Sequence, residues 1–350
     1  MSMDSSRTAY FDYMRVSALF LITLVHVAAY SWYYTPVEGF TWLALDFYKV
    51  LGRPPVLLFI MISGALFLGR EIPLKKLYGK YIPRLVIAFL FWNLVYSAVH
   101  AWGKGLTGIL AECFYVNYHF WFLLTIIGLY ICMPLLNKIA ANEKILRYFL
   151  VISFIFAFAI PEMLDLCQAF GSEGVVKYAG IIGGHIYDMH LDMFLGYPFY
   201  FLGGYYLSRQ ELGKKTRVII YILGIAALAA GVLLTWADAR QAGCSSDTFN
   251  SAFTIHELLW ALALFTAFKY GVKGKNPRLN RVAAALSKYT FGAYLMHDLI
   301  ITSISDLAGI TALSFNPLVS VPVISLATVA VGYVLSFLIN KIPFVNRYIV

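Results

Sequence analysis

The sequence is poor in charge and in cysteine. Only 13% of its 350 residues are Asp, Glu, Lys or Arg, about half the share of an ordinary soluble domain. The four cysteines form no CxxC pair, which excludes the usual zinc-ribbon and thioredoxin-like signatures. There is also no P-loop, no GxSxG elbow, no HExxH motif and no GxGxxG turn after a predicted strand. The common nucleotide-binding, serine-hydrolase and zinc-protease sites are therefore excluded.

Long apolar runs dominate the sequence instead. The chain is 61% hydrophobic, with a mean hydropathy of +0.74. A run of roughly 20 apolar residues is long enough to cross a membrane. In lipid its backbone N–H and C=O groups must hydrogen-bond to one another, as they do in a helix. We expect an all-α, polytopic membrane helical bundle, one domain over residues 1–350 with about ten transmembrane helices. These are predicted at 13–33, 50–68, 82–102, 120–136, 146–161, 192–207, 218–236, 252–270, 289–305 and 318–339.

The basic residues favour one orientation in the membrane. With both termini in the cytoplasm, all but five of the 27 lysines and arginines fall on the inner side, the exceptions being Lys49, Arg53, Lys104, Lys177 and Arg240. This bias follows the positive-inside rule and predicts a multi-pass protein of the cell membrane. It also explains the net charge of +9, so we expect no nucleic acid partner. A disulfide on the outer side remains open among Cys113, Cys167 and Cys244.

The first predicted span carries polar side chains that lipid makes costly. Asp12 and Arg15 are three residues apart and can pair on one helix face. Arg15 and His26 are eleven residues apart, nearly three turns, so they share a face at roughly 16 Å along the axis. Because an ionisable residue in lipid is usually functional, we expect chemistry at His26. A helix–helix hydrogen bond of His26, and a reach of Arg15 to the inner headgroups, are the alternatives.

His297 lies well inside the ninth predicted span. Since spans one and nine run in the same direction, His26 and His297 should reach a similar depth. Two imidazoles at one depth can form a single site, one as base and one as orienting donor. Capping of the outer helix end by His297 and Asp298 is the alternative.

Other polar residues have simpler explanations that stay open. The run 119–123, with His119 and Trp121, suits an aromatic belt at the outer interface. Lys80 and Arg84 belong to a basic cluster before span three, which suits either a phosphorylated donor or anionic lipid. The region of His185 has no metal-site spacing, so we expect no metal.

Taken in order, these segments resemble the acyltransferase-3 family of bacterial membrane proteins, especially its branch that O-acetylates surface polysaccharides. The resemblance covers nearly the whole chain. It is carried by segment 11–15 with His26, by Ser63-Gly64, by the basic start of span three, and by segments 119–123, 201–205 and 287–297.

The resemblance implies an O-acyltransferase that moves an acetyl group from cytoplasmic acetyl-CoA to a hydroxyl of an extracytoplasmic glycan or glycolipid. Arg15 and His26 match the family's essential pair, and His26 would act as base or acyl carrier. An Arg-x-x-Arg pattern of the family is only partly matched, by Lys80 and Arg84. The expected catalytic residues are Asp12, Arg15, His26 and His297, the donor contacts Arg15, Lys80 and Arg84, and the acceptor contacts His119, Trp121 and Tyr294.

A transporter is the main alternative, because some relatives are linked to serine uptake and others to polysaccharide export. A transporter would take a small polar metabolite or a polysaccharide, and it favours helices interrupted near mid-membrane. The only hint of this is the glycine-rich segment at 180–184, which we place outside the bilayer. The acceptor, the acyl chain length and the oligomeric state stay open.

Overall fold

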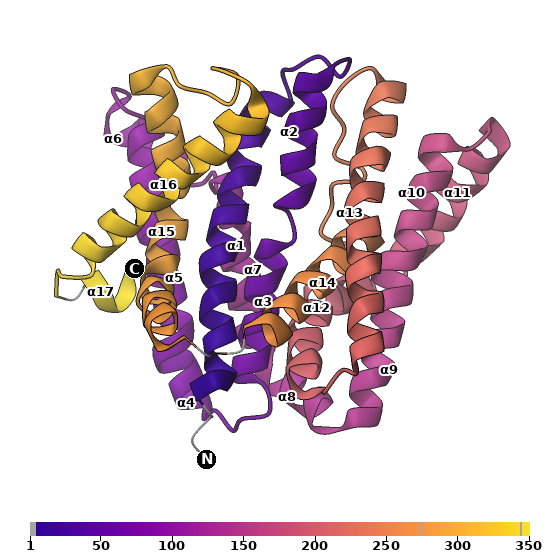
Figure 1. Cartoon of the computed structure of the whole chain (residues 1–350), viewed down its shortest axis with the longest axis horizontal. Helices are drawn as coiled ribbons and strands as arrows, with labels where there is room; N and C mark the ends of the chain where they lie inside the picture. The colour runs from indigo at the N-terminus through magenta and orange to yellow at the C-terminus, as the bar shows by residue number, and fades with distance from the viewer. Residues whose placement is uncertain (1–4, 273, 275, 344) are drawn as a thin grey trace.

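The computed structural model describes residues 5–272, 274, 276–343 and 345–350. This part of the chain is helical and contains no strand (Figure 1). Lys273 and Lys275, counted among the predicted inner charges, lie outside the described residues. The α-helices are α1 (Ser5–Trp32), α2 (Phe40–Leu51), α3 (Pro55–Phe67), α4 (Leu74–Lys76), α5 (Ile82–His100), α6 (Gly105–Glu112), α7 (Trp121–Ile131), α8 (Met133–Ala141), α9 (Glu143–Phe154), α10 (Ile160–Phe170), α11 (Glu173–Tyr187), α12 (Asp192–Arg209), α13 (Lys214–Ala242), α14 (Ile255–Gly271), α15 (Pro277–Ala308), α16 (Pro317–Ile339) and α17 (Val345–Tyr348).

The prediction of an all-α membrane bundle is confirmed, but not the count of ten spans. By length and apolar composition, six described helices can cross a membrane: Ala9–Trp32, Phe40–Phe67, Leu74–His100, Glu143–Phe170, Lys214–Ala242 and Pro317–Ile339. The pair Tyr118–Ile131 and Met133–Ala141, bent by 63°, makes a seventh if it is one span. Helices α12, α14 and α15 occupy the three remaining predicted spans, and Glu257 of α14 and Asp298 of α15 are buried against protein.

Helix α1 runs through the middle of the bundle (Figure 1). It packs against α2, α3, α14, α15 and α16. Met14, Ala18 and Leu19 on α1 are completely buried. The polar residues of α1 are therefore held at fixed positions by packing from several sides.

The second span begins at Phe40, ten residues before the predicted start at Val50, and it is interrupted. Pro54 and Pro55 lack the backbone N–H groups that would continue the helix after Leu51. The Leu51 carbonyl instead accepts a hydrogen bond from the Trp260 indole of α14 at 3.1 Å. Lys49 and Arg53, expected outside the membrane, consequently lie within this span.

Glycines bring α3 and α12 into backbone contact. A Cβ on Gly64 would lie 1.8 Å from the Phe201 carbonyl oxygen, and one on Gly204 would lie 2.1 Å from that of Met61. Small residues allow such close approach of membrane helices. Both glycines belong to segments that carry the family resemblance.

The start of the fourth span lies inside the protein. Tyr118–Phe120 form a 3-10 turn before α7, and His119 and Phe120 are 1% and 0% exposed. The aromatic-belt interpretation is therefore wrong for these two residues. The chain has already entered the bundle at this turn, where the His119 ring packs against Tyr96 and His297.

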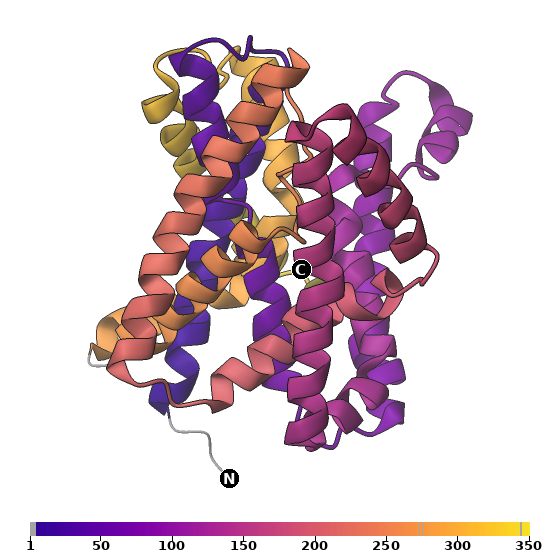
Figure 2. The ribbon, with the colours of Figure 1, turned by 90° about the vertical axis from the view of Figure 1, so that its right-hand side faces the viewer.

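The glycine-rich region after the fifth span is helical. Residues Glu143–Phe170 form one long helix, because a π-helical turn at Ile155–Ala159 accommodates Pro161, where we expected the span to end. Helix α11 then folds back against α10. In Figure 2 this hairpin lies on the side of the molecule that faces the viewer.

Candidate active site

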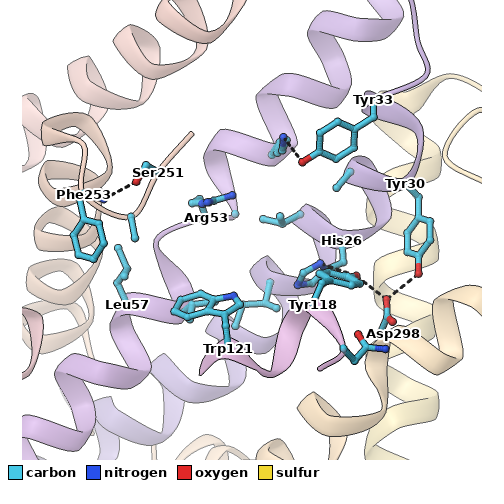
Figure 3. A pocket seen from close by; sticks show the side chains of 18 of the residues that line it. His26, Tyr30, Tyr33, Arg53, Leu57, Tyr118, Trp121, Ser251, Phe253 and Asp298 are labelled. Carbon is cyan, nitrogen blue, oxygen red and sulfur yellow. Dashed lines mark hydrogen bonds between the residues drawn. The ribbon is translucent and has the colours of Figure 1, made fainter. Parts of the chain in front are cut away.

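A cavity of about 680 Å³ lies beside the second half of α1. Its walls come from α1, the α2–α3 interruption, the 3-10 turn before α7, α12, the 251–253 loop and α15 (Figure 3). His26 of α1 lines this cavity. The cavity therefore gives a ligand access to the imidazole that the sequence singled out.

A chain of hydrogen bonds runs from His26 to Asp298. The Tyr118 hydroxyl lies 3.1 Å from His26 Nδ1 and donates to Asp298 Oδ1 at 2.7 Å. The Tyr30 hydroxyl donates to the same carboxylate oxygen at 3.0 Å. Tyr118, Tyr30 and Asp298 all line the cavity with His26 (Figure 3).

This chain selects one tautomer of His26. A tyrosine hydroxyl has one proton to donate, and Tyr118 gives it to the Asp298 carboxylate. The His26 Nδ1–H must then donate to the Tyr118 oxygen, which leaves the lone pair on Nε2. A neutral imidazole oriented in this way can act as a general base or as a nucleophile.

Two further imidazoles surround His26. The ring centroids of His26 and His297 are 4.9 Å apart, and His119 lies 5.1 Å from His297. His297 donates from Nδ1 to the Tyr294 carbonyl, and its Nε2 has no hydrogen-bond partner among the described residues. The structure thus brings together the two histidines predicted to share one depth. His297 lies within α15 and does not cap the end of that helix.

The expected acceptor contacts divide into two groups. Trp121 lines the cavity and stacks on Tyr197, with ring centroids 5.4 Å apart. His119 and Tyr294 lie behind the cavity wall, where the Tyr294 hydroxyl donates to the His119 carbonyl at 2.7 Å. Trp121 can therefore contact a ligand, whereas His119 and Tyr294 support the wall.

The predicted pair of Asp12 and Arg15 is present. Arg15 Nη1 lies 3.2 Å from Asp12 Oδ1 and 3.4 Å from Ser287 Oγ of α15. Ser287 belongs to the segment that also carries His297. Arg15 is thus fixed between α1 and α15, toward the end of the bundle opposite the cavity.

Lys80 and Arg84, the other expected donor contacts, do not lie against Arg15. Arg84 Nη2 donates to the main-chain oxygen of Val350 at 2.9 Å. Lys80 is exposed in a π-helical turn and forms no ion pair among the described residues. Arg15 and Arg84 both interact electrostatically with Tyr130.

Sequence reasoning missed Tyr118 and Arg53. Tyr118 sits one residue before the segment 119–123 and carried no signal of its own. Arg53 did carry a sequence signal, because the run Gly52-Arg53-Pro54-Pro55 places a cation and helix-breaking residues inside an apolar stretch. An intramembrane cation is a functional candidate by default.

A second charged pair closes one side of the cavity. Lys49 Nζ lies 2.7 Å from Asp247 Oδ1 and over the Trp32 ring, and the Tyr33 hydroxyl donates to Asp247 Oδ2 at 2.6 Å. Partial burial would raise the pKa of Asp247, but Lys49 and Tyr33 outweigh it and lower that pKa below its ordinary value. Asp247 is therefore an ionised partner already engaged by Lys49.

No group of three or more His, Cys, Asp or Glu residues in the described part of the chain is arranged to hold a metal ion. The four cysteines are free. The polar groups that line the cavity include imidazole, phenol, carboxylate, guanidinium and ammonium groups.

Comparison with known proteins yields one finding. A family model described as an acyltransferase domain matches residues 8–337, nearly the whole chain. No curated protein and no solved structure matches the chain significantly. The match spans both Arg15 and the cavity that contains His26.

Proposed function

Since the chain belongs to the acyltransferase-3 family, we propose that this membrane acyltransferase transfers an acetyl group from cytoplasmic acetyl-CoA to a hydroxyl of an extracytoplasmic glycan or glycolipid. The observation that carries the proposal is the position of His26. Its ring lines a cavity of about 680 Å³, and its Nδ1 is hydrogen-bonded to Tyr118, which in turn donates to Asp298.

In this mechanism His26 Nε2 removes the proton of the acceptor hydroxyl. The hydroxyl oxygen attacks the acetyl carbonyl, the carbon–sulfur bond breaks, and the imidazolium returns its proton to the leaving thiolate. The Asp298 carboxylate, acting through Tyr118, stabilises the positive charge on His26 while it holds the proton. His297 packs against His26 and restricts the orientation of its ring.

The remaining parts of the cavity and of α1 fit the two substrates. Aromatic side chains such as Trp121, Tyr197 and Tyr33 offer flat apolar faces beside hydroxyl groups, which suits a sugar. Arg15 lies toward the opposite end of the bundle, where its guanidinium would attract the phosphates of acetyl-CoA. Donor and acceptor would then approach His26 from opposite sides.

The test is acetyl transfer by purified protein in proteoliposomes. Labelled acetyl-CoA is supplied with an envelope glycan extract, and label on the glycan and release of CoA are both measured. His26→Ala should lower the rate by about 10²- to 10⁴-fold, the usual contribution of a general base, and Arg15→Ala should raise the KM for acetyl-CoA.

His185→Ala is the matched control, because His185 is exposed on α11, away from the cavity. It should retain full activity. Thermal unfolding must show that each variant is folded. Full activity of folded His26→Ala would rule out the mechanism.

The interrupted second span favours one other function. Transporters use broken helices near mid-membrane to bind polar substrates, and the interruption between α2 and α3 borders the cavity. Uptake of labelled serine or another small polar metabolite into the same proteoliposomes, without release of CoA from acetyl-CoA, would favour a transporter.

A further inference from the structure

Arg53 is a cation that lines the cavity without a direct ion-pair partner among the described residues. It lies in the interruption between α2 and α3 and lines the cavity with His26. In Figure 3 it lies between Ser251 on one side and His26 on the other. It forms no hydrogen bond or ion pair with any residue that the structure describes. An arginine within a membrane span normally pairs with another group.

The described carboxylates near Arg53 form no direct ion pair with it. Asp298 accepts from Tyr30 and Tyr118, and Asp247 is held by Lys49 and Tyr33. Glu257 is buried on α14 and interacts electrostatically with Arg53, but it forms no ion pair among the described residues. Arg53 therefore has no hydrogen-bond or ion-pair partner among the described residues, although the Asp298 carboxylate lines the same cavity.

The wall around Arg53 suits a ligand that is part sugar and part anion. Val56 and Leu57 lie in the first turn of α3 and line the cavity with Arg53. The N-terminus of a helix such as α3 adds partial positive charge. Tyr197 and Trp121 provide stacked aromatic surface in the same cavity. A guanidinium binds carboxylate or phosphate oxygens through two parallel hydrogen bonds.

We propose that the acceptor is an anionic saccharide, and that Arg53 binds its carboxylate or phosphate while the reacting hydroxyl is directed to His26. This inference rests on the proposed function and adds the chemical class of the acceptor. The anion is either the carboxylate of an acidic sugar or the phosphate that links a sugar to a lipid. Both present the same oxygen pair to Arg53.

The experiment compares matched acceptors with the wild-type protein in proteoliposomes. One pair is a uronic-acid oligosaccharide and its carboxyl-reduced, neutral form. The other is a polyprenyl-phosphate-linked sugar and the same sugar on a neutral polyprenyl alcohol. The anionic member of at least one pair should have a KM lower by about tenfold or more, and the pair that shows the difference identifies the source of the anion.

Variants then assign this preference to Arg53. Arg53→Gln should raise the KM of the anionic acceptor to that of its neutral partner, with little change for the neutral one, and Arg53→Lys should retain part of the preference. Lys104→Gln removes a positive charge from an exposed position outside the cavity and should leave the preference unchanged.

The outcomes separate this inference from the proposed function. Acetyl transfer at equal KM to both members of each pair by wild-type protein would overturn the role of Arg53 and leave the acyltransferase intact. An unchanged preference in folded Arg53→Gln would also overturn it. If no CoA is released from acetyl-CoA, either with any of the acceptors or without an acceptor, the proposed function itself would be refuted.

Discussion

At the scale of single residues, the reactivity of His26 depends on groups that contact its far side. Tyr118 is placed between an imidazole and a carboxylate, so Asp298 acts on His26 through the Tyr118 hydroxyl and not by direct contact. Tyr30 donates to the same carboxylate oxygen, so Asp298 stays hydrogen-bonded if Tyr118 is lost. Tyr118 can therefore be changed without leaving the carboxylate unsatisfied.

We predict that Tyr118→Phe lowers kcat for acetyl transfer by about 10- to 100-fold, part of the contribution of an oriented general base. The KM of both substrates should change little, because only the hydroxyl is removed and the ring keeps its packing. Initial rates over a range of both substrates would separate these effects.

Tyr115→Phe, at an exposed tyrosine of the same loop, serves as the control and should keep wild-type kcat. A Tyr118→Phe protein whose KM rises while kcat is unchanged would show that the hydroxyl contacts substrate and does not orient His26.

At the scale of elements, the contact between α3 and α12 fixes one wall of the cavity. Leu57 on α3 and Tyr197 on α12 both line it, while Gly64 and Gly204 set how closely the two helices approach. Close packing of this kind is broken by a single methyl group, because backbone atoms cannot move aside as a side chain can.

We predict that Gly204→Ala lowers the melting temperature of the detergent-solubilised protein by several degrees, since about 1 kcal/mol corresponds to roughly 2–4 °C in larger domains. Gly203→Ala is the matched control, because the atom nearest to its added Cβ is a Leu150 methyl carbon 4.0 Å away. Differential scanning fluorimetry of both variants measures the effect. Equal melting temperatures would mean that the two helices can separate without cost.

At the scale of the whole molecule, the cavity and Arg15 lie toward opposite ends of the bundle. We predict that the cavity end faces the outside of the cell, as the distribution of basic residues indicates. Cys244 lies just after α13 at this end, and Glu71 lies in the loop after α3 at the other.

Labelling with a membrane-impermeant maleimide tests this orientation, in a background with Cys113, Cys132 and Cys167 replaced by serine. Cys244 should be labelled in intact cells. Glu71→Cys, combined with Cys244→Ser, should be labelled only after the cells are permeabilised. The opposite pattern would place the acceptor in the cytoplasm.

The sequence predicted the general fold and part of the site. Spacing along one helix gave the pair of Asp12 and Arg15, and equal depth gave the contact of His26 with His297. It did not predict the interruption after Leu51 or the turn that places Tyr118 beside His26. Both depend on contacts with helices far along the chain, which periodicity within one segment cannot reveal.

The hydrogen bond from Trp260 to Leu51 also has a consequence for biogenesis. The two residues are separated by 209 positions, and Lys49 likewise finds Asp247 only 198 positions later. A carbonyl or an ammonium without a partner is costly in lipid. During synthesis, α1 and α2 are therefore inserted before their partners exist. The Leu51 carbonyl and the Lys49 ammonium lack these partners until the chain has been made as far as α14. Truncation before α14 would leave these early helices as substrates for membrane quality control.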